Sequence, residues 1–188
     1  MNDRHINAAQ QLLKEQFPNI DGLQDSLLSQ LSFNPSVNEG IQIHHIGQYH
    51  WVTSTSMGGS LSVYNSLYSS LTKSIEVQLA QCYSGLINEK NILNVDVPSA
   101  QVQTGTVDCG IIAIDFARDL AYGNDPSNIS YKQEEMRQHL LRCFEKGQLK
   151  TFPRSLTGNI QRRDPGIESI LICRVCNLPV INDDMIAL

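Results

Sequence analysis

The sequence predicts an α+β domain in which a central mixed or antiparallel sheet is flanked by helices. Residues 3–17 carry apolar side chains at helical spacing, and residues 41–67 alternate at the two-residue period of strands. Residues 109–121 form a helical segment that is apolar on most of its faces. Such a helix is normally buried at the centre of a domain, so the strands are expected in the middle with helices on both sides.

Each expected element has a local pattern behind it. In chain order they are a helix over 3–17, strands over 41–46, 51–55 and 61–67, a helix over 71–83, a strand over 92–97, and helices over 109–121 and 131–146. Asp3 is the expected N-cap of the first helix, and Gly147 the expected end of the last. Gly47 and the Gly58-Gly59 pair separate the first three strands, which indicates an antiparallel meander.

Composition and charge exclude several functional classes. The 188 residues include 14 Lys and Arg against 19 Asp and Glu, a formal net charge of −5, which argues against broad nucleic-acid binding. No apolar run approaches the roughly 18 residues that a membrane-spanning helix needs, and the polar N-terminus is unlike a secretory signal. Five cysteines, an odd number, without such a signal predict free thiols in a soluble, intracellular protein.

The composition changes after Phe152, where arginine, glycine and proline become frequent. The prediction is a main domain over 1–150, a linker over 151–168 and a further segment over 169–188. The basic side chains of this region are expected to be solvated: Arg154, Arg162, Arg163 and Arg174.

The last segment contains Cys173 and Cys176 at the C-x-x-C spacing of zinc ligands. A structural zinc site needs four ligands, and neither Cys nor His follows the pair. The pair therefore either forms the truncated start of a zinc-binding module, similar to a PHD finger, or is coincidental. No metal and no cofactor is assigned, and these two cysteines are the remaining metal candidates.

The sharpest local feature is the segment Gln103-Thr-Gly-Thr-Val-Asp-Cys-Gly, which places Cys109 in the first turn of the buried helix. The unpaired N–H groups and the positive dipole end of a helix favour a thiolate there, with Asp108 as the expected cap. Gly110 leaves the backbone open, so that a carbonyl group can approach the sulfur. Cys109 is thus a candidate nucleophile, and the alternative is a small apolar residue that fills the start of a core helix.

A thiolate nucleophile needs a proton acceptor that later protonates the leaving amine. His50 follows a Gly-bearing turn and begins a strand, where its side chain can project from the end of a sheet into a cleft. The adjacent His44 and His45 point to opposite faces of one strand, a poor arrangement for a shared metal. Asn65 in the next expected strand can accept the imidazole N–H and hold the ring, although an Asn without such a role also fits a strand end.

These residues together resemble a known family. His50-Trp51, then Val63-Tyr-Asn-Ser-Leu67, then Gln103 six positions before Cys109-Gly110, have an order and spacing similar to the ubiquitin-like-protein-specific cysteine proteases of the SUMO/sentrin type. The resemblance covers residues 1–150 and implies a fold of the papain-like cysteine protease superfamily. It implies Cys109 as nucleophile, His50 as general base and acid, and Gln103 as an oxyanion-hole donor. Trp51 would roof a narrow channel beside Gly110 for a substrate that ends in Gly-Gly.

The resemblance implies a thiol protease that cleaves the peptide or isopeptide bond after the C-terminal glycine of a ubiquitin-like modifier, with a SUMO-like modifier favoured. The modifier or its conjugates are then the expected partner, and the nucleus or cytoplasm the expected location. Asn65 departs from the family, which usually has Asp there, and the N-terminal Trp of the family is missing because Trp51 is the one Trp. Two alternatives therefore stay open: an attenuated relative that binds the modifier, and an acyltransferase on the same scaffold.

Overall fold

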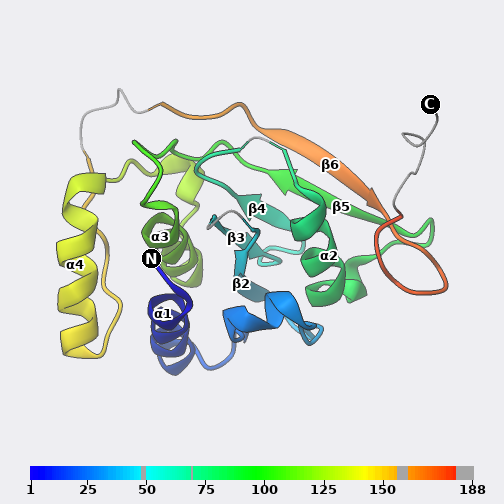
Figure 1. The fold of residues 1–188 in the computed structure, drawn as a ribbon, viewed down its shortest axis with the longest axis horizontal. Helices are drawn as coiled ribbons and strands as arrows, with labels where there is room; N and C mark the ends of the chain where they lie inside the picture. The colour runs from blue at the N-terminus through cyan, green and yellow to red at the C-terminus, as the bar shows by residue number, and fades with distance from the viewer. Residues whose placement is uncertain (48–49, 69, 156–160, 181–188) are drawn as a thin grey trace.

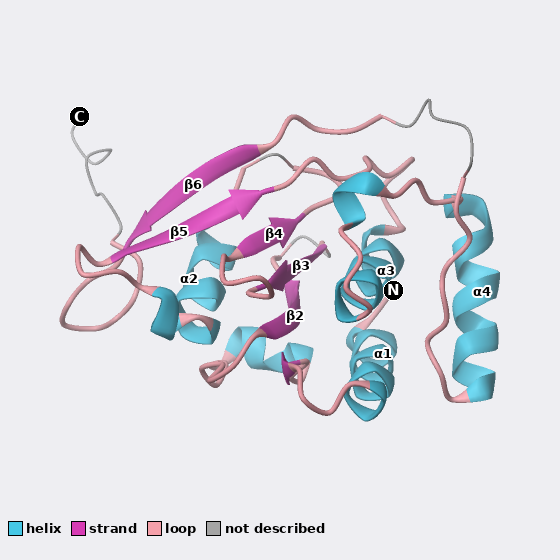
Figure 2. Cartoon of the chain, turned by 180° about the vertical axis from the view of Figure 1, so that it is seen from behind, coloured by secondary structure: helices cyan, strands magenta, loops and turns pink. Residues whose placement is uncertain are grey.

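The computed structural model describes residues 1–47, 50–68, 70–155 and 161–180, which form a six-stranded mixed sheet with helices on both faces (Figure 1 and Figure 2). In order across the sheet the strands are β1 (Asp21–Gly22), β2 (Gly40–His45), β3 (Trp51–Thr55), β4 (Ser62–Tyr64), β5 (Ile92–Val97) and β6 (Gly166–Leu171). β1 pairs with β2, and β4 with β5, in parallel, and the other neighbours are antiparallel. The expected fold class and the meander of β2, β3 and β4 are confirmed.

The helices are α1 (Asp3–Gln16), α2 (Lys73–Cys82), α3 (Cys109–Ala121) and α4 (Gln133–Lys146), with short 3-10 turns η1 (Ser26–Gln30), η2 (Ser84–Leu86) and η3 (Pro126–Asn128). α1, α3 and α4 lie on one side of the sheet and α2 on the other (Figure 1). Gly147 ends α4 in the left-handed conformation, as predicted, whereas the N-cap of α1 is Asn2 and not Asp3, since the Asn2 side chain accepts the N–H of His5. Within the described segments every helix is too short or too polar to cross a bilayer.

The alternation of side chains along β3 divides the core into two layers. Trp51 belongs to the apolar cluster shared with α1 and α3, and Val52 to the cluster shared with α2. Thr53 faces α3 and donates its hydroxyl to the carbonyl oxygen of Ala113 at 2.7 Å. Every residue of α3 is buried, as its apolar sequence predicts.

Two arginines that were expected in solvent are attached to this core. Arg154 pairs at 2.9 Å with Asp119, a fully buried carboxylate of α3 that also accepts the hydroxyl of Tyr131 at 2.8 Å. Arg162 donates to the carbonyl oxygens of Ser127 and Ile129, both at 2.6 Å. The expectation of a solvated side chain is therefore wrong for the half-buried Arg162, whereas Arg154 stays exposed although it pairs with a buried carboxylate; buried carboxylate and carbonyl groups need such partners.

Part of the segment expected as a linker, 151–168, lies in the sheet. β6 pairs antiparallel with β5 from Gly166 opposite Val97 to Leu171 opposite Ile92, and further upstream the N–H of Val102 donates to the carbonyl oxygen of Gln161 at 2.8 Å. The exposed side chains and glycine of this edge strand obscure the alternation that marks a half-buried strand. The division of the chain into domains stays a prediction.

The burial of His44 predicts a pH-dependent stability. Its ring bonds to Gln78 Oε1 at 3.0 Å and to Ser54 Oγ at 2.7 Å, and burial lowers its pKa to about 4. Between pH 6.5 and 4 the unfolded chain binds a proton at this site that the folded chain does not, so stability falls as pH falls through this window. We expect His44 to account for roughly 3 kcal/mol of lost unfolding free energy between pH 7 and pH 4.

Urea unfolding at a series of pH values measures this loss. The H44N chain should show a flatter pH dependence than the unsubstituted chain, whatever its stability at pH 7. H5N, which changes an exposed histidine, is the matched control and should keep the original slope. An equal slope in H44N and H5N would contradict the assignment.

Candidate active site

His50 lies directly before β3, where the chain leaves a turn and enters the sheet. Its backbone N–H donates to the carbonyl oxygen of Gly47 at 2.9 Å, and Gly47 has φ of 79°, a conformation that favours glycine. His50 is only 3% exposed, and the Tyr68 ring meets the imidazole edge-on with centroids 5.2 Å apart. The turn, the sheet and this contact together hold the imidazole in place.

Asn65 directly follows β4, which ends at Tyr64 and so is shorter than the expected strand over 61–67. Its Oδ1 lies 2.8 Å from His50 Nε2 and also accepts the backbone N–H groups of Leu67 and Tyr68, at 2.8 and 3.0 Å. Because an atom that accepts two backbone N–H groups is the amide oxygen, the facing Nε2 must carry a proton. The lone pair of the neutral imidazole is then on Nδ1, which is buried without a hydrogen-bond partner in the described part of the chain.

Gln103 is held beside this pair through Ser66. Its backbone N–H donates to the carbonyl oxygen of Ser66 at 3.0 Å, and the Ser66 hydroxyl donates to Gln103 Oε1 at 2.8 Å. Gln103 Nε2 donates to the carbonyl oxygen of Gly105 at 2.8 Å, within the loop that leads to Cys109. Two consecutive residues, Asn65 and Ser66, thus bring the imidazole and the Gln103 amide to one place.

Cys109 begins α3, as predicted, and is 4% exposed. Asp108 occupies the N-cap position, but the expected side-chain cap is wrong. Its carboxylate accepts instead from Gln133 Nε2 at 2.7 Å and from the guanidinium of Arg137, both on α4. These bonds tie the loop before Cys109 to α4. The first N–H groups of any helix lack hydrogen-bond partners inside that helix.

The start of α3 lies against the start of β3. A Cβ atom on Gly110 would come within 3.2 Å of Trp51 Cδ1 and 2.9 Å of Met1 Cβ, so a larger residue would force these neighbours apart. Further along, Thr53 bonds to Ala113, so helix and strand run side by side in a fixed register. Cys109 directly precedes Gly110, and His50 directly precedes Trp51. The two candidate catalytic residues are therefore the chain neighbours of the pair that makes this contact.

Comparisons with known proteins agree with this arrangement at the level of the fold. No protein-family profile matches the sequence, and no curated protein matches it either. A solved structure of the C-terminal Ulp1 protease domain in complex with Smt3, the yeast ortholog of SUMO, matches with a TM-score of 0.59 and 15% identity over 78% of this chain and 77% of that one. SUMO protease Ulp1 with its catalytic cysteine oxidised to a sulfinic acid matches with a TM-score of 0.61 and 16% identity, over 80% of this chain and 79% of that one. The chain has the fold of the SUMO protease domain.

Sequence reasoning missed three residues of this SUMO-protease fold that lie beside His50 and Gln103: Ser66, Tyr68 and Arg163. Ser66 is a small polar residue whose one signal was its position next to Asn65. Arg163 lies in the segment expected as a linker, but its backbone N–H donates to the carbonyl oxygen of Ala100 at 3.3 Å, three residues before Gln103. It is half-buried, and within the described ranges its Nε has no partner, so the expectation of a solvated side chain is wrong here too.

The surroundings of His50 keep its imidazole neutral. Burial lowers the pKa of His50, the hydrogen bond to Asn65 partly offsets this, and the positive charge of Arg163 lowers the pKa further. The imidazole is therefore in the form that is able to accept a proton near neutral pH.

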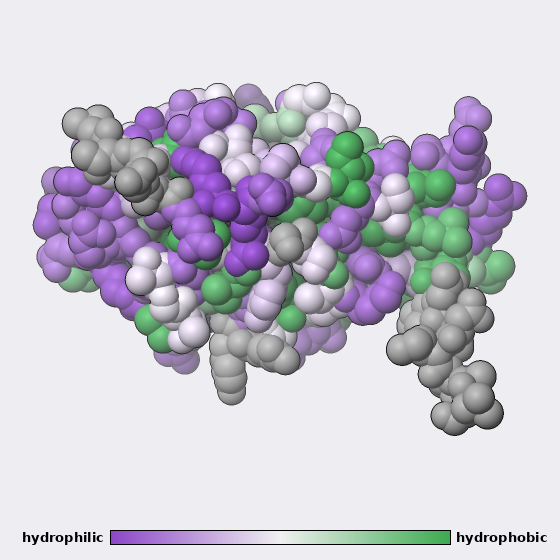
Figure 3. Space-filling view, turned by 90° about the horizontal axis from the view of Figure 1, so that it is seen from above, coloured by the Kyte–Doolittle hydropathy of each residue, from purple (hydrophilic) through white to green (hydrophobic). Residues whose placement is uncertain are grey.

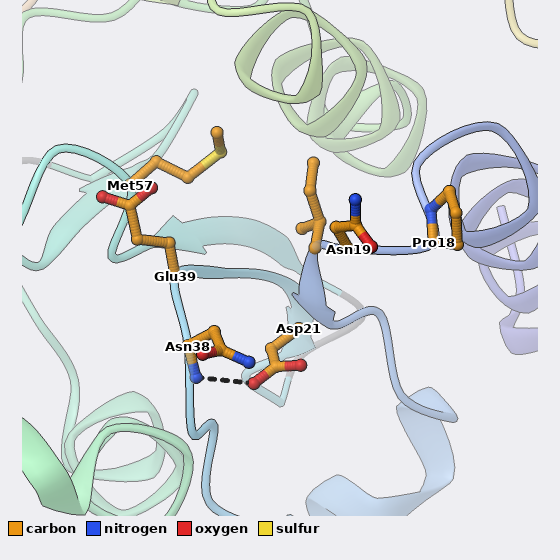
Figure 4. A pocket seen from close by; sticks show the side chains of 7 residues that line it. Pro18, Asn19, Asp21, Asn38, Glu39 and Met57 are labelled. Carbon is orange, nitrogen blue, oxygen red and sulfur yellow. Dashed lines mark hydrogen bonds between the residues drawn. The ribbon is translucent and has the colours of Figure 1, made fainter.

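A cavity of about 610 Å³ lies elsewhere on the molecule, beyond the far end of β3 (Figure 4). Its carboxylates already have partners: Asp21 Oδ2 accepts the N–H groups of Val37 and Asn38, at 2.9 and 2.7 Å, and Glu39 Oε1 accepts the N–H of Gly58 at 2.8 Å. The acidic side chains of this cavity therefore hold turns together.

Replacement of Arg163 by glutamine should raise the pKa of His50, because a positive charge that disfavours imidazolium is removed. An NMR titration of the His50 ring protons measures this directly. We expect the midpoint of R163Q at higher pH than that of the unsubstituted chain, and the acid limb of any His50-dependent activity to move with it. K90Q is the matched control, because it removes an exposed positive charge two residues before the start of β5. Identical His50 midpoints in R163Q and K90Q would rule out the influence of Arg163.

Proposed function

We propose that the protein is a cysteine protease that cleaves the peptide or isopeptide bond after the C-terminal glycine of a ubiquitin-like modifier, with SUMO-like modifiers favoured. The observation that carries the proposal is the buried hydrogen bond between His50 Nε2 and Asn65 Oδ1, in a chain with the fold of the SUMO protease domain. This bond orients an imidazole whose Nδ1 has an open lone pair among the described residues. A nucleophile–base–orienter set of Cys, His and Asn is sufficient for acyl transfer in other folds.

In the proposed first step, His50 Nδ1 takes the proton of the Cys109 thiol while the sulfur attacks the carbonyl carbon of the substrate glycine. The position of Cys109 in the first turn of α3 supports this role, because the helix dipole favours negative charge on the sulfur. A tetrahedral intermediate forms, and its oxygen carries a negative charge. Gln103 uses one amide N–H for Gly105, and its second N–H together with a backbone N–H of α3 would stabilise this oxygen.

The imidazolium then gives its proton from Nδ1 to the leaving amine, and the carbon–nitrogen bond breaks to leave a thioester on Cys109. A water molecule gives one proton to Nδ1 as its oxygen attacks the thioester. Nδ1 returns this proton to the departing sulfur to restore the thiol, and the released glycine carboxyl group loses its own proton to solvent. Asn65 keeps Nε2 protonated through the whole cycle and so prevents the ring from turning.

The close contact between Gly110 and Trp51 supports the choice of substrate. Cys109 is buried and Gly110, directly after it, packs closely against Trp51, so a substrate that reaches the sulfur would have to pass through a narrow space beside Trp51. Residues without side chains fit such an opening, and a modifier that ends in glycines provides them. The substrate partner is thus proposed to be the ubiquitin-like protein itself or its conjugates.

A SUMO protein that carries a C-terminal electrophile should label Cys109 covalently. The expected result is one adduct on the Cys109 peptide by mass spectrometry, complete loss of labelling in C109S, and retention in C143S, which changes a buried cysteine of α4. A ubiquitin probe of the same chemistry tests the modifier preference and should react more slowly. A folded chain that binds SUMO but leaves both probes unreacted would instead be a non-catalytic relative.

Replacement of Asn65 by aspartate should accelerate the reaction. Oδ1 already accepts three hydrogen bonds, so an ionised carboxylate is stabilised there, and its charge favours the imidazolium that forms in each step. We expect cleavage of a fluorogenic SUMO substrate to rise about tenfold, since a charged hydrogen bond contributes about 1.4 kcal/mol more than a neutral one. N65A removes the acceptor and should be slower than the unsubstituted chain. A rate of N65D at or below that of the unsubstituted chain, with unchanged SUMO binding, would refute this role.

A further inference from the structure

A short loop, residues 104–108, separates Gln103 from Cys109, the proposed oxyanion donor and the proposed nucleophile. Residues 104–107 are exposed, and Gly105 has φ of 74°, in the left-handed region. Seen from above, the end of the molecule that carries α4, beside this loop, is mainly hydrophilic (Figure 3). An exposed loop has little apolar packing to fix its shape, so hydrogen bonds to neighbouring elements must hold it.

Gln133, the first residue of α4, joins the two ends of this loop. Its Oε1 accepts the backbone N–H of Thr104 at 2.7 Å. Its Nε2 donates to the carbonyl oxygen of Thr104 at 2.8 Å and to Asp108 Oδ2 at 2.7 Å. Because the partners are one donor and two acceptors, a single orientation of the amide satisfies all of them. One side chain thus holds both the residue that follows Gln103 and the residue that precedes Cys109.

A second glutamine fixes the start of α4 against the same segment of chain. Gln101 Oε1 accepts the backbone N–H of Tyr131 at 2.7 Å, and Gln101 Nε2 donates to the carbonyl oxygen of Tyr131 at 3.1 Å. Gln101 is buried, and it also forms an antiparallel bridge with Arg162. Each of the two segments therefore sends a glutamine amide to the backbone of the other, and this exchange fixes where Gln133 lies relative to the loop.

Arg137, one turn further along α4, contacts only the second end of the loop. Its guanidinium donates to the carbonyl oxygen of Val107 at 3.1 Å and pairs with the Asp108 carboxylate. The Arg137 side chain is 55% exposed, so solvent screens this ion pair and reduces its contribution. Gln133 is the side chain of α4 that reaches both ends.

We propose that Gln133 is a positioning residue of the active site, which closes the loop over 104–108 and so sets the spacing between the Gln103 amide and the Cys109 sulfur. This inference rests on the proposed function, because it takes these two groups as oxyanion donor and nucleophile. The donor must lie about 3 Å from an oxygen whose carbon is bonded to the sulfur, so the two groups need a fixed separation. Since Gln133 acts through them, its loss should lower kcat and leave KM nearly unchanged.

The Q133E variant tests this role in the reaction. It keeps the size of the side chain and an acceptor for the Thr104 N–H, but it replaces both donors by a carboxylate that faces Asp108. We expect kcat for a fluorogenic SUMO substrate to fall roughly ten- to hundredfold, because small displacements of reacting groups have effects of this size. Q138E, the same substitution at an exposed glutamine of α4, is the matched control and should keep the original kcat.

The pH dependence separates positioning from a general loss of structure. Relative to the unsubstituted chain, the deficit of Q133E should shrink as pH falls, because a protonated carboxyl group at this position donates to Asp108 again. Q133A has no group there that can donate at any pH, so its deficit should stay constant. Circular dichroism shows whether the variants are folded, and if Q133A is unfolded the deficit of the more conservative Q133E and its pH dependence decide.

Amide hydrogen exchange measured by NMR tests the closure of the loop without a substrate. The Thr104 N–H should exchange faster in Q133A than in the unsubstituted chain or in Q138E, because its acceptor is removed. The N–H of Cys173 is bonded within the turn after β6 that also holds Cys176, and it is the internal reference with an unchanged rate in every variant.

Two results would overturn the proposal. Unchanged exchange of Thr104 in Q133A would show that Gln133 does not close the loop. Faster exchange, with kcat of Q133A and Q133E within about twofold of the unsubstituted value, would show that closure does not position the reacting groups. A folded chain that neither cleaves SUMO nor reacts with the SUMO probe would contradict the proposed function, and the exchange of Thr104 would then decide the closure of the loop on its own.

Discussion

The hydrogen bond between His50 Nε2 and Asn65 Oδ1 determines which ring nitrogen can act as a base, and the surrounding structure is arranged so that this bond forms. His50 precedes β3 and Asn65 follows β4, two antiparallel neighbours. The turn residue Gly47 sets the position of the first, and the N–H groups of Leu67 and Tyr68 fix the oxygen of the second. An imidazole that is buried and held from both directions has lost the freedom to turn, so its open nitrogen faces one direction only.

The buried helix α3 supplies the complementary constraint. Its first turn meets Trp51 through Gly110, and its middle is joined to β3 by the bond between Thr53 and Ala113. Asp108, directly before it, is bound to α4, so the loop that carries Gln103 and Cys109 is attached at both ends. A helix with every residue buried and its loop attached in this way resists displacement. The proposed nucleophile requires such rigidity, because reacting atoms must meet within a few tenths of an ångström.

Much of this arrangement could be predicted from sequence because the signals are local. The alternation over 41–55 gives the strands that carry His50, the apolar run after Cys109 gives the buried helix, and a strand-end Asn is where an imidazole partner can lie. Arg163 and β6 could not be found, because their partners, Ala100 and β5, are about 60 to 80 residues earlier and no local period records such pairing. Asp108 failed as a cap for the same reason, since a distant arginine competes for its carboxylate.

Two neighbours of His50 act on its pKa in opposite directions, and neither supplies a negative charge. Beyond the lowering by burial, the hydrogen bond to Asn65 raises the pKa of the imidazole and the positive charge of Arg163 lowers it, so the imidazolium is less stable than it would be beside a carboxylate. In the proposed protease the imidazole is therefore neutral at rest, without a preformed imidazolium. The imidazolium that forms during the reaction is less stabilised than it would be beside an aspartate, so the oxyanion donors would carry a larger share of the transition-state stabilisation.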